Sequence, residues 1–560
     1  MSDLVHSRLR APTADGFALI DPPLSQAAAL IERNRAIGGA FDQSAGFSSE
    51  FRTAARILLL SAAAIGEGVE PDGNDLKRPI AIGGHQPELF HPGVWFKNFV
   101  LSAIAERVGG TGINLAIDND TVQRTSIRVP DRGAAQVQVS DVLFDKSAAE
   151  VPWERRDILD LDRFRRFDKA VAQHFKPYLA EPAYRHGMLL GRVWPHAWNA
   201  AQRQQDAGRE ALQLSGGRRL PSSIAGSANL GQCLVAGRRG VERELGLKTR
   251  ETQLSLVADD SCFVEFADRL LMRHREFHEI HNAALAEYRA VNHVRSPSRP
   301  IANLARDGEW YEAPFWLWSF SDSERRKVFV RRVDGRWQIT DRQGITFTRQ
   351  VSADRDDDLW IRLVEQGLQL RPRALITTMY ARLVLSDLFI HGIGGAKYDE
   401  VTDLIIRRFF GVEPPAYITA TTTFRLPIER PSVTFDDVRD SARRIREARF
   451  RPEAFLRDRL LTGEAAIAGR LAALAAEKRE FLDKHDLRRC PPQVFARLDL
   501  LNRAMHDLLQ PVERELRAEH AELLVQLKNS QLLGSREFSF VLFPSEILPA
   551  RLLDLCKVSS

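Results

Sequence analysis

Apolar and polar positions alternate in blocks along the first part of the chain, and the clearest blocks lie between residues 79 and 120. The apolar run 79–82 predicts a buried strand, and residues 94–108 predict an amphipathic helix that Gly109 ends. The apolar run 113–117 predicts a second strand. A strand–helix–strand order is typical of a parallel sheet, whose ligands bind outside the carboxyl ends of the strands.

A second block with the same order lies near residue 390. The apolar run 383–390 predicts a strand, a glycine-rich turn follows it, and residues 396–410 predict a helix that Gly411 ends. We expect the two blocks to be the halves of one Rossmann-like parallel sheet, with the chain between them inserted. The predicted fold class is therefore α/β.

The other segments differ in periodicity. Residues 1–75 indicate helices, whereas residues 327–340 alternate as strands do around a hairpin turn at Asp334-Gly335. The aromatic run before this hairpin includes Trp310, Trp316 and Trp318, which either stack on a ligand ring or pack the hairpin onto the core. The predicted boundaries are 1–75 for a helical lead-in, 76–130 for the first half of the core, 131–369 for an inserted region with a small antiparallel sheet, 370–430 for the second half of the core, 431–535 for a helical arm and 536–560 for a docking tail.

The predicted arm has the longest helical pattern. Thr434 and Asp437 resemble a capping box, and apolar residues then recur about every seven positions on both sides of Pro491-Pro492. Two long helices joined at these prolines should lie antiparallel as a coiled-coil hairpin. Lys478 falls on the apolar seam, so the arm either forms this hairpin or packs against the body.

Charge and composition narrow the class of protein. The formal net charge of +5 is small for 560 residues, and acidic residues are interleaved with the arginines, so we expect no nucleic-acid partner. The four cysteines form no CxxC pair, which fits a reducing compartment. The sequence after Met1 lacks the apolar core of a signal peptide, and the longest apolar run, 57–65, is shorter than a membrane span. We expect a cytoplasmic protein without a membrane partner.

Polar residues gather at the ends of the first two predicted strands. His85, Gln86 and His91 follow the first strand, and Asp118-Asn119-Asp120 follows the second. His85, His91 and the two aspartates would be reasonable metal ligands, but no close His-x-x-x-His spacing supports a metal site, and we expect none. We expect instead polar binding of a sugar, a nucleotide or an amine. Asp118 suits contacts to hydroxyl or ammonium groups, with helix capping as the alternative.

The turn after residue 390 predicts an anion site. Gly392, Gly394 and Gly395 open the following helix, whose bare N–H groups and dipole favour phosphate or carboxylate groups. His391 can donate to an oxyanion or carry a proton, and Lys397 adds a positive charge. Tyr398 and Asp399 follow on the same helical turns. The alternative is that the glycines only permit a tight turn, and the spacing is not that of a Walker A motif.

These landmarks resemble the bacillithiol-biosynthesis cysteine-adding enzymes. That family carries a G-Q-Q-x-x-L-F-x-G-P segment, which here is residues 84–93, and an acidic E-D-H-D cluster, which here is residues 118–120. An L-R-P segment (residues 370–372) and an R-E-R-x-x-N-x-x-P-like tail (from Arg536) follow in the family's order. The chain departs from the pattern at His85, where the family has Gln, and in its glycine-rich turn.

The resemblance implies a core akin to nucleotidylyltransferases, an inserted domain, and a coiled coil that binds a nucleotide such as ATP or ADP and forms a homodimer. It implies a ligase that joins cysteine or another amino acid to an amino-sugar conjugate such as glucosaminyl-malate. Two other functions stay open: a nucleotidyltransferase acting on a sugar phosphate, and a non-catalytic assembly protein that works through its arm. For the ligase, we expect catalytic roles for His85, Asp118, Asp120 and His391, and substrate binding by Gln86, His91, Asn119, Gly392, Gly394, Gly395, Lys397, Tyr398 and Asp399.

Overall fold

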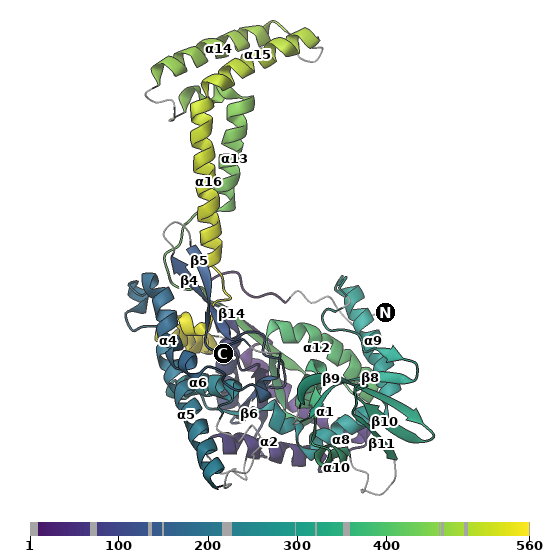
Figure 1. Ribbon diagram of the computed structural model, residues 1–560. Helices are drawn as coiled ribbons and strands as arrows, with labels where there is room; N and C mark the ends of the chain where they lie inside the picture. The colour runs from purple at the N-terminus through teal and green to yellow at the C-terminus, as the bar shows by residue number, and fades with distance from the viewer. Residues whose placement is uncertain are drawn as a thin grey trace. The chain divides into compact units, whose positions relative to one another are not determined.

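The structure is a computed structural model in which the chain divides into two compact units (Figure 1). The first unit comprises Met1–Val129, Ser140–Leu426 and Arg536–Ser560, and the second comprises Pro130–Val139 and Pro427–Ser535. The structure describes residues 9–67, 75–132, 137–147, 150–214, 227–296, 298–319, 322–350, 359–458, 460, 464–485 and 491–558.

A largely parallel sheet forms the centre of the first unit and confirms the predicted mixed α/β class. The strands lie in the order β1-β14-β13-β2-β3-β6, and all neighbours pair in parallel except the edge strand β1, which runs antiparallel to β14. β1 lies in the segment for which only helices were expected. The strands of this central sheet are β1 (Phe17–Asp21), β2 (Ile80–His85), β3 (Thr111–Ala116), β6 (Thr249–Gln253), β13 (Leu388–His391) and β14 (Tyr417–Thr423).

The direction in which strands are added reverses between β2 and β13. The chain passes from β2 to β3 and then to β6 on one side, and it later returns to place β13 and β14 on the other side of β2. Ile390 of β13 is paired with Gly83 of β2, so both strands end at the same edge. β6 lies within residues 131–369, which were expected to be an insertion, so this region contributes a strand to the central sheet. A reversal of this kind leaves a crevice at the carboxyl ends of the strands.

Helix α3 (Pro92–Arg107) covers one face of the sheet and is buried on almost every side. A methyl group added at Gly83 would lie 3.7 Å from Leu101, which shows how closely the helix approaches β2. The C-terminal segment covers the rest of α3: helix α17 (Ile547–Val558) contacts it, and the rings of Phe540 and Trp95 are 4.5 Å apart. The amphipathic pattern expected for residues 94–108 is therefore wrong, because the second face of α3 is covered by residues far along the chain.

The opposite face of the sheet carries the main hydrophobic core. Ile80, Ile82, Ile113 and Leu115 point into it, and helices packed there share the cluster. Gly411 ends the segment after α12 with a φ of 68°, as predicted. The other helices of this unit are α1 (Ala27–Ala45), α2 (Phe51–Glu67), α4 (Leu161–Phe175), α5 (Leu190–Leu214), α6 (Leu230–Glu244), α7 (Leu254–Ala258), α8 (Ser261–Met272), α9 (His274–Val291), α10 (Leu359–Glu365), α11 (Ala374–Tyr380) and α12 (Ile393–Ile405).

An antiparallel sheet of order β11-β10-β9-β8-β12, with β7 beside β8, packs into the same core. The predicted hairpin is confirmed, since Asp334 and Gly335 join β9 to β10 with positive φ angles of 51° and 75°. Its strands are β7 (Arg306–Asp307), β8 (Trp310–Ser319), β9 (Asp322–Val333), β10 (Arg336–Thr340), β11 (Thr346–Gln350) and β12 (Leu368–Pro372). A separate two-stranded ribbon is formed by β4 (Ser126–Arg132) and β5 (Val137–Leu143).

The predicted strand 383–390 is only half correct, because residues up to 385 belong to a π-helical turn and the strand begins at Leu388. The short 3₁₀ and π turns of the described residues are η1 (Leu24–Gln26), η2 (Trp153–Arg155), η3 (Lys176–Tyr178), η4 (Pro182–Tyr184), η6 (Ala381–Leu385), η7 (Ile406–Phe410), η8 (Pro452–Arg457) and η11 (Phe540–Leu542).

The second unit is helical, with α13 beside α16 and α14 beside α15 (Figure 1). The capping box of Thr434 and Asp437 is confirmed at the start of α13. The single long helix expected after Pro492 is wrong, because it breaks at Leu509 and a new helix begins with Pro511 in its first turn. The helices are α13 (Phe435–Phe450), α14 (Ala465–Asp483), α15 (Pro492–Leu508) and α16 (Gln510–Leu533).

Lys478 lies on the apolar seam of this unit without leaving its charge unpaired. Its ammonium group is 2.8 Å from the carboxylate of Glu453, which follows α13. Leu471, Met505 and Leu516 are among the buried residues of the surrounding cluster. Across the described residues, no helix combines the length and the apolar character that a bilayer crossing requires.

Candidate functional site

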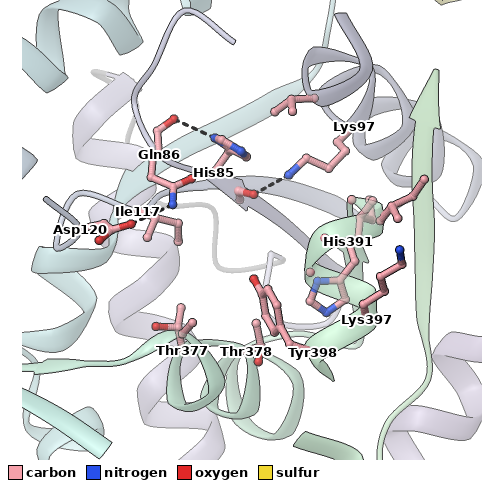
Figure 2. Close-up of a pocket in the computed structure, with 18 of the residues that line it drawn as sticks. His85, Gln86, Lys97, Ile117, Asp120, Thr377, Thr378, His391, Lys397 and Tyr398 are labelled. Atoms are coloured by element: carbon pink, nitrogen blue, oxygen red, sulfur yellow. Dashed lines mark hydrogen bonds between the residues drawn. The ribbon is translucent and has the colours of Figure 1, made fainter. Parts of the chain in front are cut away.

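A cavity of about 740 Å³ opens where β2, β3 and β13 end, at the reversal in strand order. All of its lining residues belong to the first unit. His85, Gln86 and Lys97 lie on one side, and His391, Lys397 and Tyr398 lie on the other (Figure 2). The polar loop after β2 and the glycine-rich turn after β13 therefore line the same cavity.

The lining of this cavity is strongly cationic. Among its described lining residues Asp120 is the one carboxylate, and Trp316 contributes an aromatic ring. The positive side chains come from segments far apart in the sequence, and they are Arg10, Lys97, Arg325, Arg373, Lys397 and Arg536. An excess of positive charge in a concave site attracts and holds anions. The cavity therefore suits a ligand with several negative charges.

The N-terminus of α12 faces this cavity. Gly392 is its N-cap residue, and the residues of the first turn line the cavity. The first N–H groups of a helix have no partner within the helix, so they are available to an anion. No atom lies within 4 Å of a methyl group placed on Gly394, whereas one placed on Gly395 would lie 2.6 Å from Nδ1 of His391. Gly395 is thus required for the position of the histidine ring.

The ring of His391 is oriented by a hydrogen bond to the buried carboxylate of Asp399. Nε2 of His391 lies 2.6 Å from Oδ2 of Asp399. The carboxylate also accepts hydrogen bonds from Thr378 and Thr402, at 2.6 and 2.7 Å, and from Arg382 at 2.7 Å. Asp399 is fully buried and does not line the cavity, so its expected contact with a substrate does not fit its position.

The charge state of Asp399 follows from these contacts. Burial by itself raises the pKa of Asp399, but the charges of His391 and Arg382 and the hydrogen bonds lower that pKa to well below its usual range. The carboxylate is therefore ionised and acts only as an acceptor, so Nε2 of His391 carries a proton and donates it. The other ring nitrogen, Nδ1, lies on the side of Gly395, which itself lines the cavity.

Lys97 is a buried amine in the largely buried helix α3. Its Nζ atom donates to the carbonyl oxygen of Gly84 at 2.6 Å (Figure 2), and its side chain lies 3.8 Å from a methyl group placed on Gly392. Burial, with a smaller effect of the Arg238 charge, lowers the pKa of Lys97 to about 8. Lys97 thus joins the end of β2 to the turn after β13 and can lose its proton near neutral pH.

The first loop forms a hydrogen-bonded wall around Asp120. Its carboxylate accepts from Nε2 of Gln86 at 3.0 Å (Figure 2) and from Arg325 at 3.0 Å. The Arg325 and Arg373 guanidinium groups stack on the ring of Trp316, with their central carbons 4.8 and 4.1 Å from its centroid. Trp316 therefore contacts two cations of the cavity. Arg373 is paired in turn with a buried glutamate of β8.

The other residues expected in the first loop have mixed positions. Asn119 lines the cavity and donates to the carbonyl oxygen of Pro372 at 2.7 Å. His85 lines it too, and burial lowers the pKa of His85 to about 3, so this ring is neutral. His91 is the N-cap of α3, where Nδ1 accepts from the N–H of Gly93 at 3.1 Å. Burial also lowers the pKa of His91.

Asp118 lies beside the cavity but does not line it. Its two carboxylate oxygens accept from the N–H of Ser255 at 2.8 Å and from the Ser255 hydroxyl at 2.5 Å, in the first turn of α7. Burial, followed by the nearby charge of Glu154, raises the pKa of Asp118 to about 7. The capping alternative therefore describes Asp118, and the expected contact with an amine substrate does not fit its position.

Several lining residues escaped prediction from the sequence. Lys97 had a usable signal, since it is a lone lysine among mostly apolar residues in the first half of the helix that follows the first loop. Arg325 and Arg373 come from β9 and the start of α11, and Arg536 comes from the C-terminal segment. The packing of distant segments brings these arginines together, and no local sequence pattern predicts that packing. Among the described residues, no group of three or more His, Cys, Asp or Glu side chains is placed to hold a metal ion.

No protein-family model matches the sequence, and a search of curated proteins finds no significant match.

Proposed function

We propose that this protein is an enzyme that forms an amide bond between an amino acid, such as cysteine, and an anionic amino-sugar conjugate, such as glucosaminyl-malate. The cationic cavity at the strand reversal carries this proposal, because it offers a multiply charged carboxylate or phosphate ligand both arginines and the N-terminus of α12. The resemblance of residues 84–93, 118–120 and 370–372 to the bacillithiol-biosynthesis cysteine-adding enzymes supports the choice of substrates. The strand order supports a Rossmann-like core.

Amide formation requires a neutral amine and an activated carboxyl group. In the proposed reaction, ATP transfers a phosphoryl group to the carboxylate, which gives an acyl phosphate and ADP. The neutral amine then attacks the acyl carbon, the new C–N bond forms, and phosphate leaves with the electrons of the broken C–O bond. Nδ1 of His391 accepts the proton that the amine loses, and Asp399 orients the ring and balances its new charge.

The cations of the cavity stabilise the negative charge that develops on the acyl oxygen and on the leaving phosphate. Lys97 suits this role, because its side chain lines the cavity, with the amine at the carbonyl oxygen of Gly84 and the Cδ atom near the turn at Gly392. Bound phosphate or carboxylate groups favour the charged form of Lys97, so ligand binding raises its pKa from the value of the empty cavity. Ligand binding therefore favours the charged ammonium form of Lys97, which stabilises the negative charge that develops in the reaction.

The direct test incubates the full-length protein with L-cysteine, glucosaminyl-malate, ATP and Mg²⁺ and follows products by mass spectrometry. We expect a product whose mass is the sum of the two substrates less one water, together with ADP, and no product when ATP is omitted. His391→Gln and Lys97→Met should abolish most turnover. Lys248→Met is the matched control, because the Lys248 side chain is 76% exposed in the same unit. Absence of product from the wild-type protein would overturn the proposal.

A nucleotidyltransferase acting on a sugar phosphate is the second candidate. The open N-terminus of α12 at the strand reversal favours it, since nucleotide phosphates bind at this position in parallel sheets. The two functions differ in their products. A nucleotidyltransferase releases pyrophosphate from ATP with a sugar phosphate alone and keeps the nucleotide in its product, whereas the ligase needs the amine and releases ADP.

A further inference from the structure

A second, smaller cavity of about 390 Å³ adjoins the cationic cavity. The two cavities share His85, His91 and Val94 in their linings, so a ligand in one faces a ligand in the other across these side chains. Fully or almost fully buried aromatic residues, Trp153 and Phe144, also line the smaller cavity. Its lining residues all belong to the first unit.

The charges of the smaller cavity differ from those of the larger one. Its described lining residues include two carboxylates, Glu88 and Glu537, and two guanidinium groups, Arg124 and Arg128. Glu537 is engaged with His91, whose Nε2 lies 3.6 Å from it. The side chains of Glu88, Arg124 and Arg128 make no hydrogen bond or close ion pair with any residue that the structure describes. Both signs of charge are therefore available to a ligand.

The half-buried carboxylate of Glu88 is influenced by charged residues that line each of the two cavities. Burial raises the pKa of Glu88, the nearby charge of Asp120 raises it further, and the charge of Arg124 lowers it. Glu88 lies in the loop after β2, whereas Arg124 comes just before β4 and Arg128 lies within it. A partly buried carboxylate without a partner is stabilised by a bound ammonium group.

We propose that the smaller cavity binds a zwitterionic α-amino acid, with its ammonium group at Glu88 and its carboxylate at Arg124 and Arg128. This inference rests on the proposed amide-forming function and gives its amino-acid substrate a site of its own. The anionic conjugate occupies the larger cavity, which shares His85, His91 and Val94 with the smaller one. Glu88 thus takes the ammonium-binding role expected of Asp118, whose carboxylate is occupied by Ser255.

The test measures binding of single ligands to the full-length protein by isothermal titration calorimetry. The zwitterionic probe is L-cysteine, and two probes lack one charge each: cysteamine lacks the carboxylate, and 3-mercaptopropionate lacks the ammonium group. We expect L-cysteine to bind at least tenfold more tightly than either single-charge probe. Glu88→Gln and Arg124→Met should each weaken L-cysteine binding at least tenfold. Glu546→Gln is the control, because the Glu546 side chain is 61% exposed outside both cavities.

A second titration with ATP and with malate separates the two proposals. Both probes should bind Glu88→Gln and Arg124→Met as they bind the wild type, and both should bind Lys97→Met more weakly. If L-cysteine does not bind but ATP or malate does, the inference about the smaller cavity fails while the anion site stands. If L-cysteine binding falls in Lys97→Met and not in Glu88→Gln, the amino acid occupies the larger cavity and the inference is wrong. Circular dichroism of each variant confirms that it is folded.

Discussion

Nε2 of His391 lies 2.6 Å from Oδ2 of Asp399. His391 is the last residue of β13, and Asp399 lies within the helix that follows it, α12. The carboxylate is buried and fully hydrogen-bonded, and the ring of His391 reaches the cavity above it. A histidine held in this way has one defined tautomer and one defined orientation. Such a ring can accept a proton at Nδ1 without moving, which a general base requires.

Replacement of His391 by glutamine should separate proton transfer from structure. Gln can still donate to Asp399, so the free energy of unfolding should change by no more than about 1 kcal/mol. It cannot accept a proton, so kcat should fall by about 10²–10⁴-fold with KM nearly unchanged. Steady-state kinetics and urea denaturation measure both. A variant with wild-type kcat would exclude His391 as the base.

Gly394 and Gly395 form a natural pair of variants in the first turn of α12. Gly395→Ala should cost about 1–3 kcal/mol of stability, because the added methyl group overlaps Nδ1 of His391. Gly394→Ala meets no atom within 4 Å and should cost nothing measurable. Chemical denaturation gives the difference, and the His391 ring signals in NMR should shift only in Gly395→Ala. Equal stabilities of the two variants would contradict this packing.

Lys97 should make stability depend on pH in the alkaline range. Its folded pKa, about 8, is lower than the unfolded value near 10.4, so the unfolded state binds more protons between these pH values. Stability therefore rises with pH through this window, and below pH 8 the full cost of the buried charge is present. Relative to Lys97→Met, the wild type should gain on the order of 2 kcal/mol between pH 7.5 and 9.5.

Urea denaturation of both proteins at the two pH values checks this, with Lys248→Met as a control for loss of an exposed charge. A constant difference between wild type and Lys97→Met would mean that Lys97 keeps an ordinary pKa in the folded protein.

Asp118 and Asp120 should respond differently to alanine. Asp118→Ala removes a buried acceptor of two Ser255 hydrogen bonds and should cost about 1–3 kcal/mol of stability. The Asp120 side chain is 42% exposed, so Asp120→Ala should cost less than about 1 kcal/mol. Asp120→Ala should instead change ligand affinity, because Gln86 and Arg325 lose their partner at the cavity wall. Thermal unfolding and titration with malate distinguish the two, and reversed effects would contradict the assignment.

Local patterns predicted the elements that depend on local physics. The strands predicted at 79–82 and 113–117, which the structure has at 80–85 and 111–116, follow from local burial. The hairpin at Asp334, the capping box at Thr434 and the stop at Gly411 follow from turn chemistry or capping over a few residues. The edge strand β1 was missed, because the strand with which it pairs, β14, lies about 400 residues further along the chain. The burial of α3 was missed for the same reason, since its outer face is covered by the C-terminal segment.

The residues of the candidate site were likewise predictable where they are neighbours in the sequence. His391, Lys397 and the glycines stand next to one another in the sequence, and the structure places them on the cavity wall. The roles of Asp118 and Asp399 were not predictable, because a carboxylate at a strand end or on a helix can face a ligand or a neighbouring segment. Ser255 and Arg382 decide this, and both lie in elements whose position depends on the whole fold.

The larger cavity takes its wall from distant parts of the chain: Arg10 precedes the first strand, and Arg536 follows the whole helical unit. During synthesis, the ribosome must therefore produce residues 427–535 before the residue that completes the wall leaves the exit tunnel. A nascent chain that has already made all the strands of the central sheet still lacks Arg536 and the aromatic cover of α3. Ligand binding should consequently begin only late in translation, after the helical unit has emerged and the final segment has packed onto α3.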